Sequence, residues 1–273
     1  MKKVIIILIL TGALFFPDAS GQVHYTNTSV ILEKLFSRLI ASNEDAERIQ
    51  INDSIDLIIQ SYAGSDTVFN HKFTNLRYLG QITSRNSQLK IITWNLVLKD
   101  SISRYYCYLI HNSGKRNLAY RLEGVYREGP VRTDTVYSDK NWYGALYYDL
   151  RPFKKDDQTN WVLLGIDYGN QAITRKIIDV LSFASDGSII LGKKIFATGE
   201  ALKYREVLEY GSEAVISLKF LTDKSIVFDH LVPVSPALKG KKEYYGPDFS
   251  YDAYGLEKGT WKFKSNVDVK NKK

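Results

Sequence analysis

From about residue 67 to residue 232, short runs rich in Val, Ile, Thr, Tyr and Trp follow one another, separated by Gly, Asn, Asp or Ser. Such runs are typical of β-strands. No helical pattern of useful length separates them, which argues against a parallel β–α–β architecture. The sequence therefore predicts a mainly β protein, an antiparallel meander that closes into a barrel or folds over as a sandwich. The predicted strands are 89–99, 104–112, 117–122, 142–151, 160–168, 174–183, 188–196, 203–210, 214–221 and 225–232.

The N-terminal part has a different periodicity. Apolar residues recur at helical spacing in 31–40 and again in 51–62, which gives each segment one apolar stripe. Gly64 follows the second stripe and suits a helix end. We therefore expect a helical hairpin within residues 22–66 that buries both stripes against the β part, residues 67–232.

The C-terminal part, residues 233–273, contains three prolines and many aromatic residues. Because proline interrupts regular strands, we expect an irregular segment here that either fills the core or lines a cleft. In a cleft, aromatic rings offer flat faces to sugars or peptides. The candidate ligand-binding residues of this segment are Tyr244, Tyr245, Tyr251, Tyr254 and Trp261.

The first residues have the three-part pattern of a secretory signal peptide. Two lysines precede the apolar run Val4–Leu10, and small residues at Ala19 and Gly21 predict cleavage near Gly21–Gln22. The run is shorter than the roughly 20 residues that a membrane-spanning helix needs. We therefore expect a signal peptide at 1–21 and a single exported domain at 22–273, periplasmic or secreted, without a transmembrane segment in the mature chain.

The cysteine content and the charge of the chain bear on its disulfides and on its partners. The only cysteine, Cys107, lies in an apolar run, so we expect a buried side chain and no internal disulfide. The formal net charge is +7, but the basic residues are scattered and no nucleic-acid-binding module accompanies them. We expect a solvated basic surface and no nucleic-acid partner.

Six aspartates lie in apolar or aromatic runs, where a carboxylate is costly unless it is paired or hydrogen-bonded. The expected role is structural; the alternative is glycoside hydrolysis by two carboxyls about 5 to 9.5 Å apart. The six are Asp149, Asp167, Asp179, Asp229, Asp248 and Asp252, and the catalytic candidates are Asp229, Asp248 and Asp252. Adjacent strand residues point to opposite faces, so Asp229 and His230 cannot pair with each other.

Oxygen-bearing side chains alternate at Asp248, Ser250 and Asp252, a spacing that suits a hard cation such as calcium. The match to a helix–loop–helix calcium loop fails at Ala253 and Gly259, where that loop has Gly and Glu. The competing interpretation is a turn whose carboxylates accept main-chain amides. We expect no cofactor.

Four Asp-(Ser/Thr)-apolar triplets resemble the acceptor sequence of a general bacterial O-glycosylation system. Modification would require exposed loops, because an attached glycan must sit in water. The four candidate acceptors are Ser54, Thr67, Ser101 and Thr135.

The tract 142–268 is similar to uncharacterised secreted bacterial proteins, a family without an assigned activity, so the resemblance implies export but no site residues. It rests on the sequences of 176–183, 226–231 and 244–252. No serine-hydrolase elbow, zinc-protease helix or phosphate loop is present. We therefore expect a non-catalytic envelope or secreted protein that binds another envelope protein or a glycan; the alternative is a glycan-active hydrolase. A cleft with convergent carboxylates or a His–Asp contact would count against the first expectation.

Overall fold

The computed structural model describes residues 19–99, 102–114 and 116–269. Most of the expected signal peptide, residues 1–18, lies outside the described residues. Helix α1 (Ala19–Ala41) begins before the expected cleavage point, and helix α2 (Asp45–Ala63) follows it directly. The predicted helical hairpin is confirmed. None of the described helices is long and apolar enough to cross a membrane.

The strands form three sheets, which are antiparallel apart from the pairing of β9 with β15. Sheet A has the order β1-β2-β3-β4, sheet B the order β11-β7-β6-β5 with β8 beside β7, and sheet C the order β10-β9-β15-β14-β13-β12. Sheet A consists of β1 (Gly80–Thr83), β2 (Leu89–Val97), β3 (Ser103–Asn112) and β4 (Asn117–Val125). Sheet B consists of β5 (Leu146–Lys155), β6 (Gln158–Asp167), β7 (Ile173–Phe183), β8 (Ile189–Leu191) and β11 (Glu206–Gly211). Sheet C consists of β9 (Phe196–Thr198), β10 (Ala201–Lys203), β12 (Leu218–Thr222), β13 (Ser225–Pro233), β14 (Tyr245–Glu257) and β15 (Thr260–Lys264).

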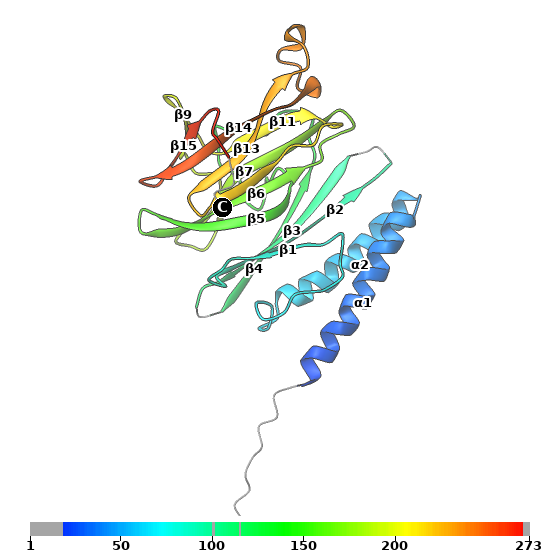
Figure 1. Ribbon diagram of the computed structural model, residues 1–273. Coiled ribbons are helices and arrows are strands. Elements are labelled where there is room, and N and C mark those ends of the chain that lie inside the picture. The colour runs from blue at the N-terminus through cyan, green and yellow to red at the C-terminus, as the bar shows by residue number, and fades with distance from the viewer. Residues whose placement is uncertain (1–18, 100–101, 115, 270–273) are drawn as a thin grey trace, which may run out of the picture.

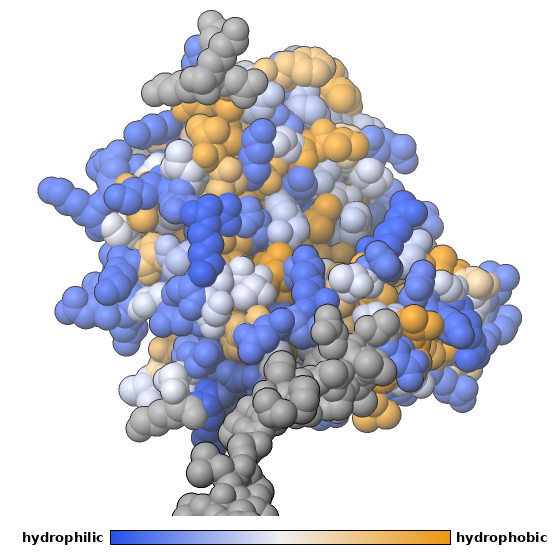
Figure 2. Space-filling view, turned by 60° about the horizontal axis from the view of Figure 1, so that its bottom comes forward, coloured by the Kyte–Doolittle hydropathy of each residue, from blue (hydrophilic) through white to orange (hydrophobic). Residues whose placement is uncertain are grey.

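These elements stack in four layers: helices, sheet A, sheet B and sheet C (Figure 1). One apolar core lies between the helices and sheet A, a second between sheets A and B, and a third between sheets B and C. The mainly β prediction is confirmed, and the arrangement is sandwich-like because no described sheet closes on itself. The outer surface in Figure 2 is mostly hydrophilic, with hydrophobic side chains in separate patches.

Sheet B is the middle layer, and both of its faces are covered. In β7, Ile177 and Leu181 belong to the core shared with sheet A, whereas Ile178 and Val180 belong to the core shared with sheet C. A strand buried on both faces is expected to be apolar along its whole length. This explains why the sequence 176–183 is almost continuously apolar and why Asp179 within it is 0% exposed.

The helices are fixed on sheet A by polar contacts as well as by apolar packing. Asn52 accepts a hydrogen bond of 2.9 Å from the indole of Trp94 in β2. The ammonium group of Lys90, 1% exposed, donates to the Tyr62 hydroxyl at 2.6 Å and to the carbonyls of Val68 and His71 at 2.6 and 2.5 Å. Burial lowers the pKa of Lys90 to about 8. Lys90 thus binds one hydroxyl and two main-chain carbonyls rather than a carboxylate. Through these carbonyls, at Val68 and His71, it fixes the loop that follows α2.

The prediction of an irregular C-terminal segment was wrong. Residues 245–257 form β14, the longest strand, and 260–264 form β15 beside it. Between them and β13, two short 3-10 turns, Pro236–Leu238 and Lys242–Tyr244, belong to a hairpin that projects from the stack (Figure 1). Pro233 and Pro247 are tolerated because one lies at a strand end and the other beside a β-bulge, where a ladder hydrogen bond is dispensable.

Candidate functional site

Two of the six aspartates are sealed inside the protein by arginines. Asp179 Oδ2 lies 3.0 Å from Arg205 Nε, and both side chains are 0% exposed. Tyr143 donates its hydroxyl hydrogen to the same carboxylate at 2.8 Å, and the Val180 amide donates to its other oxygen at 2.7 Å. Nη1 of Arg205 donates to the carbonyls of Arg132 and Thr135, and Nη2 donates to that of Leu191. Every side-chain nitrogen and oxygen atom of the charged pair therefore has a partner inside the fold.

The second sealed aspartate, Asp167, is organised in the same way. Its Oδ2 lies 3.2 Å from Arg175 Nη1, and Arg175 Nε donates to Glu209 at 2.8 Å. The hydroxyl of Tyr105 donates to Asp167 Oδ1 at 2.8 Å. Arg175 also donates to the carbonyls of Arg127, Glu128 and Gly129. Burial raises the pKa of Asp167, whereas the arginine and the donated hydrogen bonds oppose the rise.

Together the two arginines hold the connector between sheets A and B. All but one of the carbonyls that they bind belong to residues 127–135, which lead from β4 towards β5. Gly192 shows how closely Arg205 is enclosed: its φ is +103°, and a Cβ there would lie 2.4 Å from Arg205 Nη2. These acids are structural, and neither is accessible to a substrate.

Two further candidate aspartates interact with residues two positions along the chain. Asp149 forms an ion pair with Arg151, its neighbour two residues along β5. Asp248 accepts from the amide and the hydroxyl of Ser250 at 3.0 and 2.7 Å, which is the turn geometry that competed with a metal site. Among the described residues, no group of three or more His, Cys, Asp or Glu side chains is arranged to hold a metal ion.

Asp252 has a different kind of partner. Its Oδ2 lies 2.7 Å from Nδ1 of His230, and its Oδ1 accepts the Asn266 amide at 3.3 Å. A carboxylate accepts hydrogen bonds, so the Nδ1 hydrogen is donated to Asp252, and Nε2 is the ring nitrogen that this contact does not use. The Asp252 side chain is 7% exposed, whereas that of His230 is 39% exposed.

The pairing of β13 with β14 produces this contact. Phe228 stands opposite Asp252, but the register shifts between Asp229 and Leu231, so three residues, 248–250, face His230 alone. Bulges of this kind redirect side chains and often lie beside functional sites. His230 and Asp229 do not pair with each other, as the alternation of strand side chains requires; instead Asp229 accepts the Ser217 amide at 2.6 Å.

The His230–Asp252 pair lines a cleft between β11 of sheet B and strands β13 and β14 of sheet C, with a volume of about 260 Å³. We call it the His230 cleft. Glu206 on its wall accepts from the Tyr254 hydroxyl at 2.6 Å and from Lys203 at 2.9 Å. Acidic, basic and aromatic groups thus meet around one small space. The lining residues used here are His230, Asp252, Glu206, Lys203, Lys242 and Tyr245.

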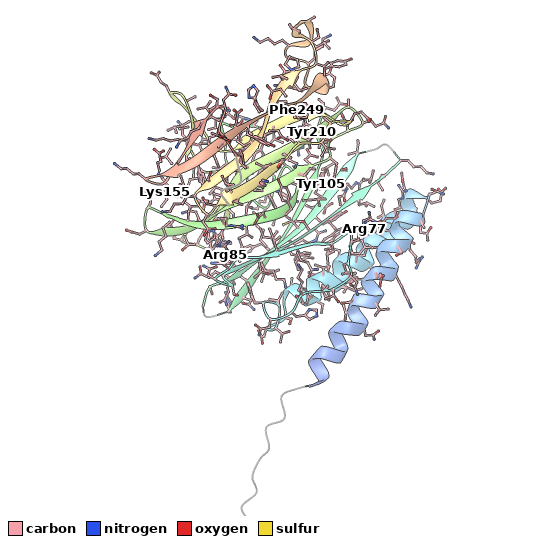
Figure 3. The ribbon with its side chains drawn as sticks, viewed as in Figure 1. Arg77, Arg85, Tyr105, Lys155, Tyr210 and Phe249 are labelled. Atoms are coloured by element: carbon pink, nitrogen blue, oxygen red, sulfur yellow. The ribbon has the colours of Figure 1, made fainter. Side chains whose placement is uncertain are left out.

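The aromatic candidates fall into different places. Tyr245 lines the His230 cleft, and Lys242 Nζ lies 4.2 Å from the centre of its ring. Tyr244 is 45% exposed on the projecting hairpin. Tyr251 lines an open hollow beside Phe249, which is 90% exposed and lies on the outer sheet (Figure 3).

The expectation for Tyr254 and Trp261 as ligand platforms needs correction. Both are 0% exposed and belong to the core between sheets B and C. Their rings are enclosed because β14 and β15 form part of a regular sheet whose inner face packs on sheet B. Only the Tyr254 hydroxyl reaches the wall of the cleft, through its bond to Glu206.

Sequence reasoning missed His230, Glu206 and Lys203 as site residues. The available signal was the position of His230 in an apolar strand beside a candidate acid, but its partner lies 22 residues away on a strand that the prolines concealed. Comparisons of the chain with protein-family models, curated proteins and solved structures give no match.

Proposed function

We propose that this chain is an exported binding protein that holds a small polar ligand, a sugar unit of a glycan, in the His230 cleft. The proposal rests on the His230–Asp252 pair, in which a buried carboxylate orients an imidazole that remains exposed. The same contact counts against a purely non-catalytic role, and it is therefore also the ground for the second candidate function below. An oriented imidazole loses little conformational entropy when it hydrogen-bonds a ligand hydroxyl. Such pre-organisation favours binding.

The lining of the cleft suits a sugar. Tyr245 offers a ring face, and Glu206 and Lys203 offer hydrogen-bond acceptors and donors on the wall. Sites with a few convergent polar groups among aromatic side chains are typical of small-ligand pockets, whose volumes are roughly 300–1,000 Å³. At about 260 Å³ the His230 cleft lies just below that range, which favours one or two sugar rings over a long chain.

An array of bacterial and host oligosaccharides tests the proposal. We expect the chain to bind a discrete set of glycans, and Asp252→Asn to weaken binding by about tenfold, the effect of losing one charge-assisted hydrogen bond. Asp186→Asn is the matched control, because Asp186 is also an aspartate but bonds Ser188 in the turn between β7 and β8, away from the cleft. Absence of binding across the array, or equal losses in both variants, would contradict the proposal.

A second candidate function, hydrolysis of the bound glycan, is favoured by the same His–Asp contact. A histidine held by a carboxylate can accept a proton from an attacking water. Incubation of the chain with its array ligands, followed by mass spectrometry, distinguishes binding from turnover. Cleavage products that disappear in Asp252→Asn would establish hydrolysis, and intact ligands at full occupancy would exclude it.

We also propose that residues 1–21 direct export and that the exported chain carries O-glycans. Ser54 lies on an exposed part of α2 and Thr67 in an exposed turn, whereas Ser101 lies outside the described residues. Thr135 is half-buried, and its carbonyl binds Arg205. The intact mass of the chain from the natural host checks both points: it should begin at Gln22 and exceed the sequence mass. A mass that includes residues 1–21 would contradict export by cleavage.

A further inference from the structure

A second hollow lies on another side of sheet B, between the edge strand of sheet A and the edge strand of sheet B. Strand β1 forms one border and β5 the other, and the volume is about 470 Å³. We call it the tyrosine groove. It is separate from the His230 cleft, which lies at β11 on the opposite edge of the same sheet. The groove residues used here are Arg77, Tyr78, Gly80, Thr93, Tyr148 and Tyr168.

Three exposed tyrosines from three different segments line the groove. Tyr78 precedes β1, Tyr148 lies in β5 and Tyr168 follows β6, and they are 49%, 38% and 51% exposed. The Tyr148 hydroxyl is already used, because it donates to the Leu218 carbonyl at 2.9 Å. Exposed rings placed around one groove present apolar faces with polar edges, the surface on which the C–H faces of a sugar pack.

Polar groups lie among these rings. Arg77 Cζ lies 5.9 Å from the centre of the Tyr78 ring, so its guanidinium is close to an aromatic wall, and Figure 3 labels it on the sheet A side of the molecule. Asn95, half-buried in β2, is also part of the lining. Planar donors beside aromatic faces are the usual means by which sugar hydroxyls are recognised.

The floor of the groove contains a polar atom that the fold does not satisfy. Thr93 is 1% exposed, and its Oγ1 has no hydrogen-bond partner among the described residues. It stands directly beside Gly80, where an added Cβ would lie 2.8 Å from this oxygen. A buried hydroxyl without a partner is costly. The hydroxyl itself is buried, but Gly80 has no side chain to occupy the space between it and the groove.

From these observations we infer that the tyrosine groove is a second binding site, for a carbohydrate chain. The sugar rings stack on Tyr78 and Tyr168, and one hydroxyl reaches Thr93 past Gly80. The site has a larger volume than the His230 cleft and more exposed aromatic surface, so it suits a longer chain. This inference goes beyond the proposed function and does not depend on it.

Affinity electrophoresis in gels containing soluble xylan, mixed-linkage β-glucan, mannan or mucin tests the site. We expect at least one polysaccharide to retard the chain, and Tyr78→Ala and Tyr168→Ala each to weaken that retardation by roughly fivefold or more, as for loss of a stacking contact of about 1 kcal/mol. Tyr244→Ala is the matched control, since Tyr244 is equally exposed but lies on the projecting hairpin. No retardation in any gel, or an equal loss in the control, would overturn the inference.

Thr93→Val separates binding from structure. The substitution keeps the shape of the side chain and removes the unsatisfied hydroxyl, so we expect the melting temperature to stay the same or rise while retardation weakens. Unchanged retardation, or a lower melting temperature, would contradict a ligand role for this hydroxyl. If Asp252→Asn abolishes retardation while Tyr78→Ala does not, the polysaccharide binds in the His230 cleft instead, and the inference is overturned.

Discussion

The carboxylates of Asp179 and Asp252 are both buried and both paired, yet their partners differ in access to water. Arg205 is as enclosed as Asp179, and all its hydrogen bonds in the structure end on protein atoms. His230 is 39% exposed and lines a cleft. The first pair holds the connector between sheets A and B; the second has a partly exposed member that lines a cleft.

This difference shows why burial of a carboxylate is a poor guide to function on its own. A sealed ion pair in the middle sheet is costly to break, because loss of one member leaves the other charged and unsatisfied. A pair with an exposed member contributes little to stability, since water replaces the lost contact. Substitutions in the Asp179–Arg205 pair should therefore lower stability, whereas substitutions in the His230–Asp252 pair should mainly weaken ligand binding.

The largest expected effect is at Asp179. Asp179→Asn removes the countercharge of Arg205 within a core that is 0% exposed, and we expect the free energy of unfolding to fall by about 3–5 kcal/mol. Urea denaturation measures the change. A loss below about 1 kcal/mol would break the comparison, because it would mean that the sealed pair is no more important to stability than a surface one.

A smaller loss, about 2–4 kcal/mol, is expected for Arg175→Met, since Asp167 keeps its hydrogen bonds from Tyr105 and Gly169 and Glu209 is partly exposed. The three main-chain carbonyls released at residues 127–129 should loosen the connector. Limited trypsin digestion should then cut after Arg127 or Arg132 faster than in the wild-type chain. Unchanged cleavage would show that the connector does not need this arginine.

Lys90 extends the comparison to a third kind of buried charged group, because it is bound by a hydroxyl and two carbonyls instead of an ionised partner. Its pKa is lowered from 10.5 to about 8, so between these values the unfolded chain binds more protons than the folded one, and stability rises with pH. Cys107 and the buried tyrosines, whose pKa values burial raises, act in the opposite direction. Their contributions cancel when the wild-type chain is compared with Lys90→Met.

We expect the unfolding free energy of the wild-type chain, relative to Lys90→Met, to rise by about 1–2 kcal/mol between pH 7.5 and 9.5. Denaturant titrations at several pH values measure this difference. A constant difference across that range would show that the pKa of Lys90 is close to that of an exposed lysine. A falling difference would show that the folded state retains the proton more strongly.

The smallest stability effect is expected in the His230 cleft. Asp252→Asn should lower the unfolding free energy by less than about 1 kcal/mol, because its partner is partly in water and the amide still accepts a hydrogen bond. The same variant should bind the glycan about tenfold more weakly. A stability loss as large as that of Asp179→Asn would place Asp252 among the structural acids and remove the distinction between the two regions.

The strands were predictable where composition and periodicity agree. In β2, β3, β6 and β7, branched and aromatic residues fill both faces of the strand, and the sequence contains no competing signal. The 188–196 prediction was less accurate: the structure divides it between β8 and β9, because the chain passes from sheet B to sheet C through Gly192. A local pattern does not contain information about such a change of sheet.

The candidate site was only partly predictable, because it depends on register. Asp252 was identified as a candidate acid, but the prolines of the C-terminal segment suggested irregular structure, so no strand was available to bring it to His230. The deciding feature is the bulge at 248–250 opposite His230. Strand pairing at a distance of 22 residues is set by the packing of sheet C on sheet B, and no single segment of the sequence specifies it.

The central claim is that a ligand meets the imidazole of His230. Side-chain ¹⁵N spectra of histidine-labelled protein test it, with the oligosaccharide that binds most tightly on the array added to saturation. We predict that the His230 resonances shift while those of His71 and His111, which lie elsewhere in the fold, stay in place. Saturation of the protein with no change at His230 would contradict the account.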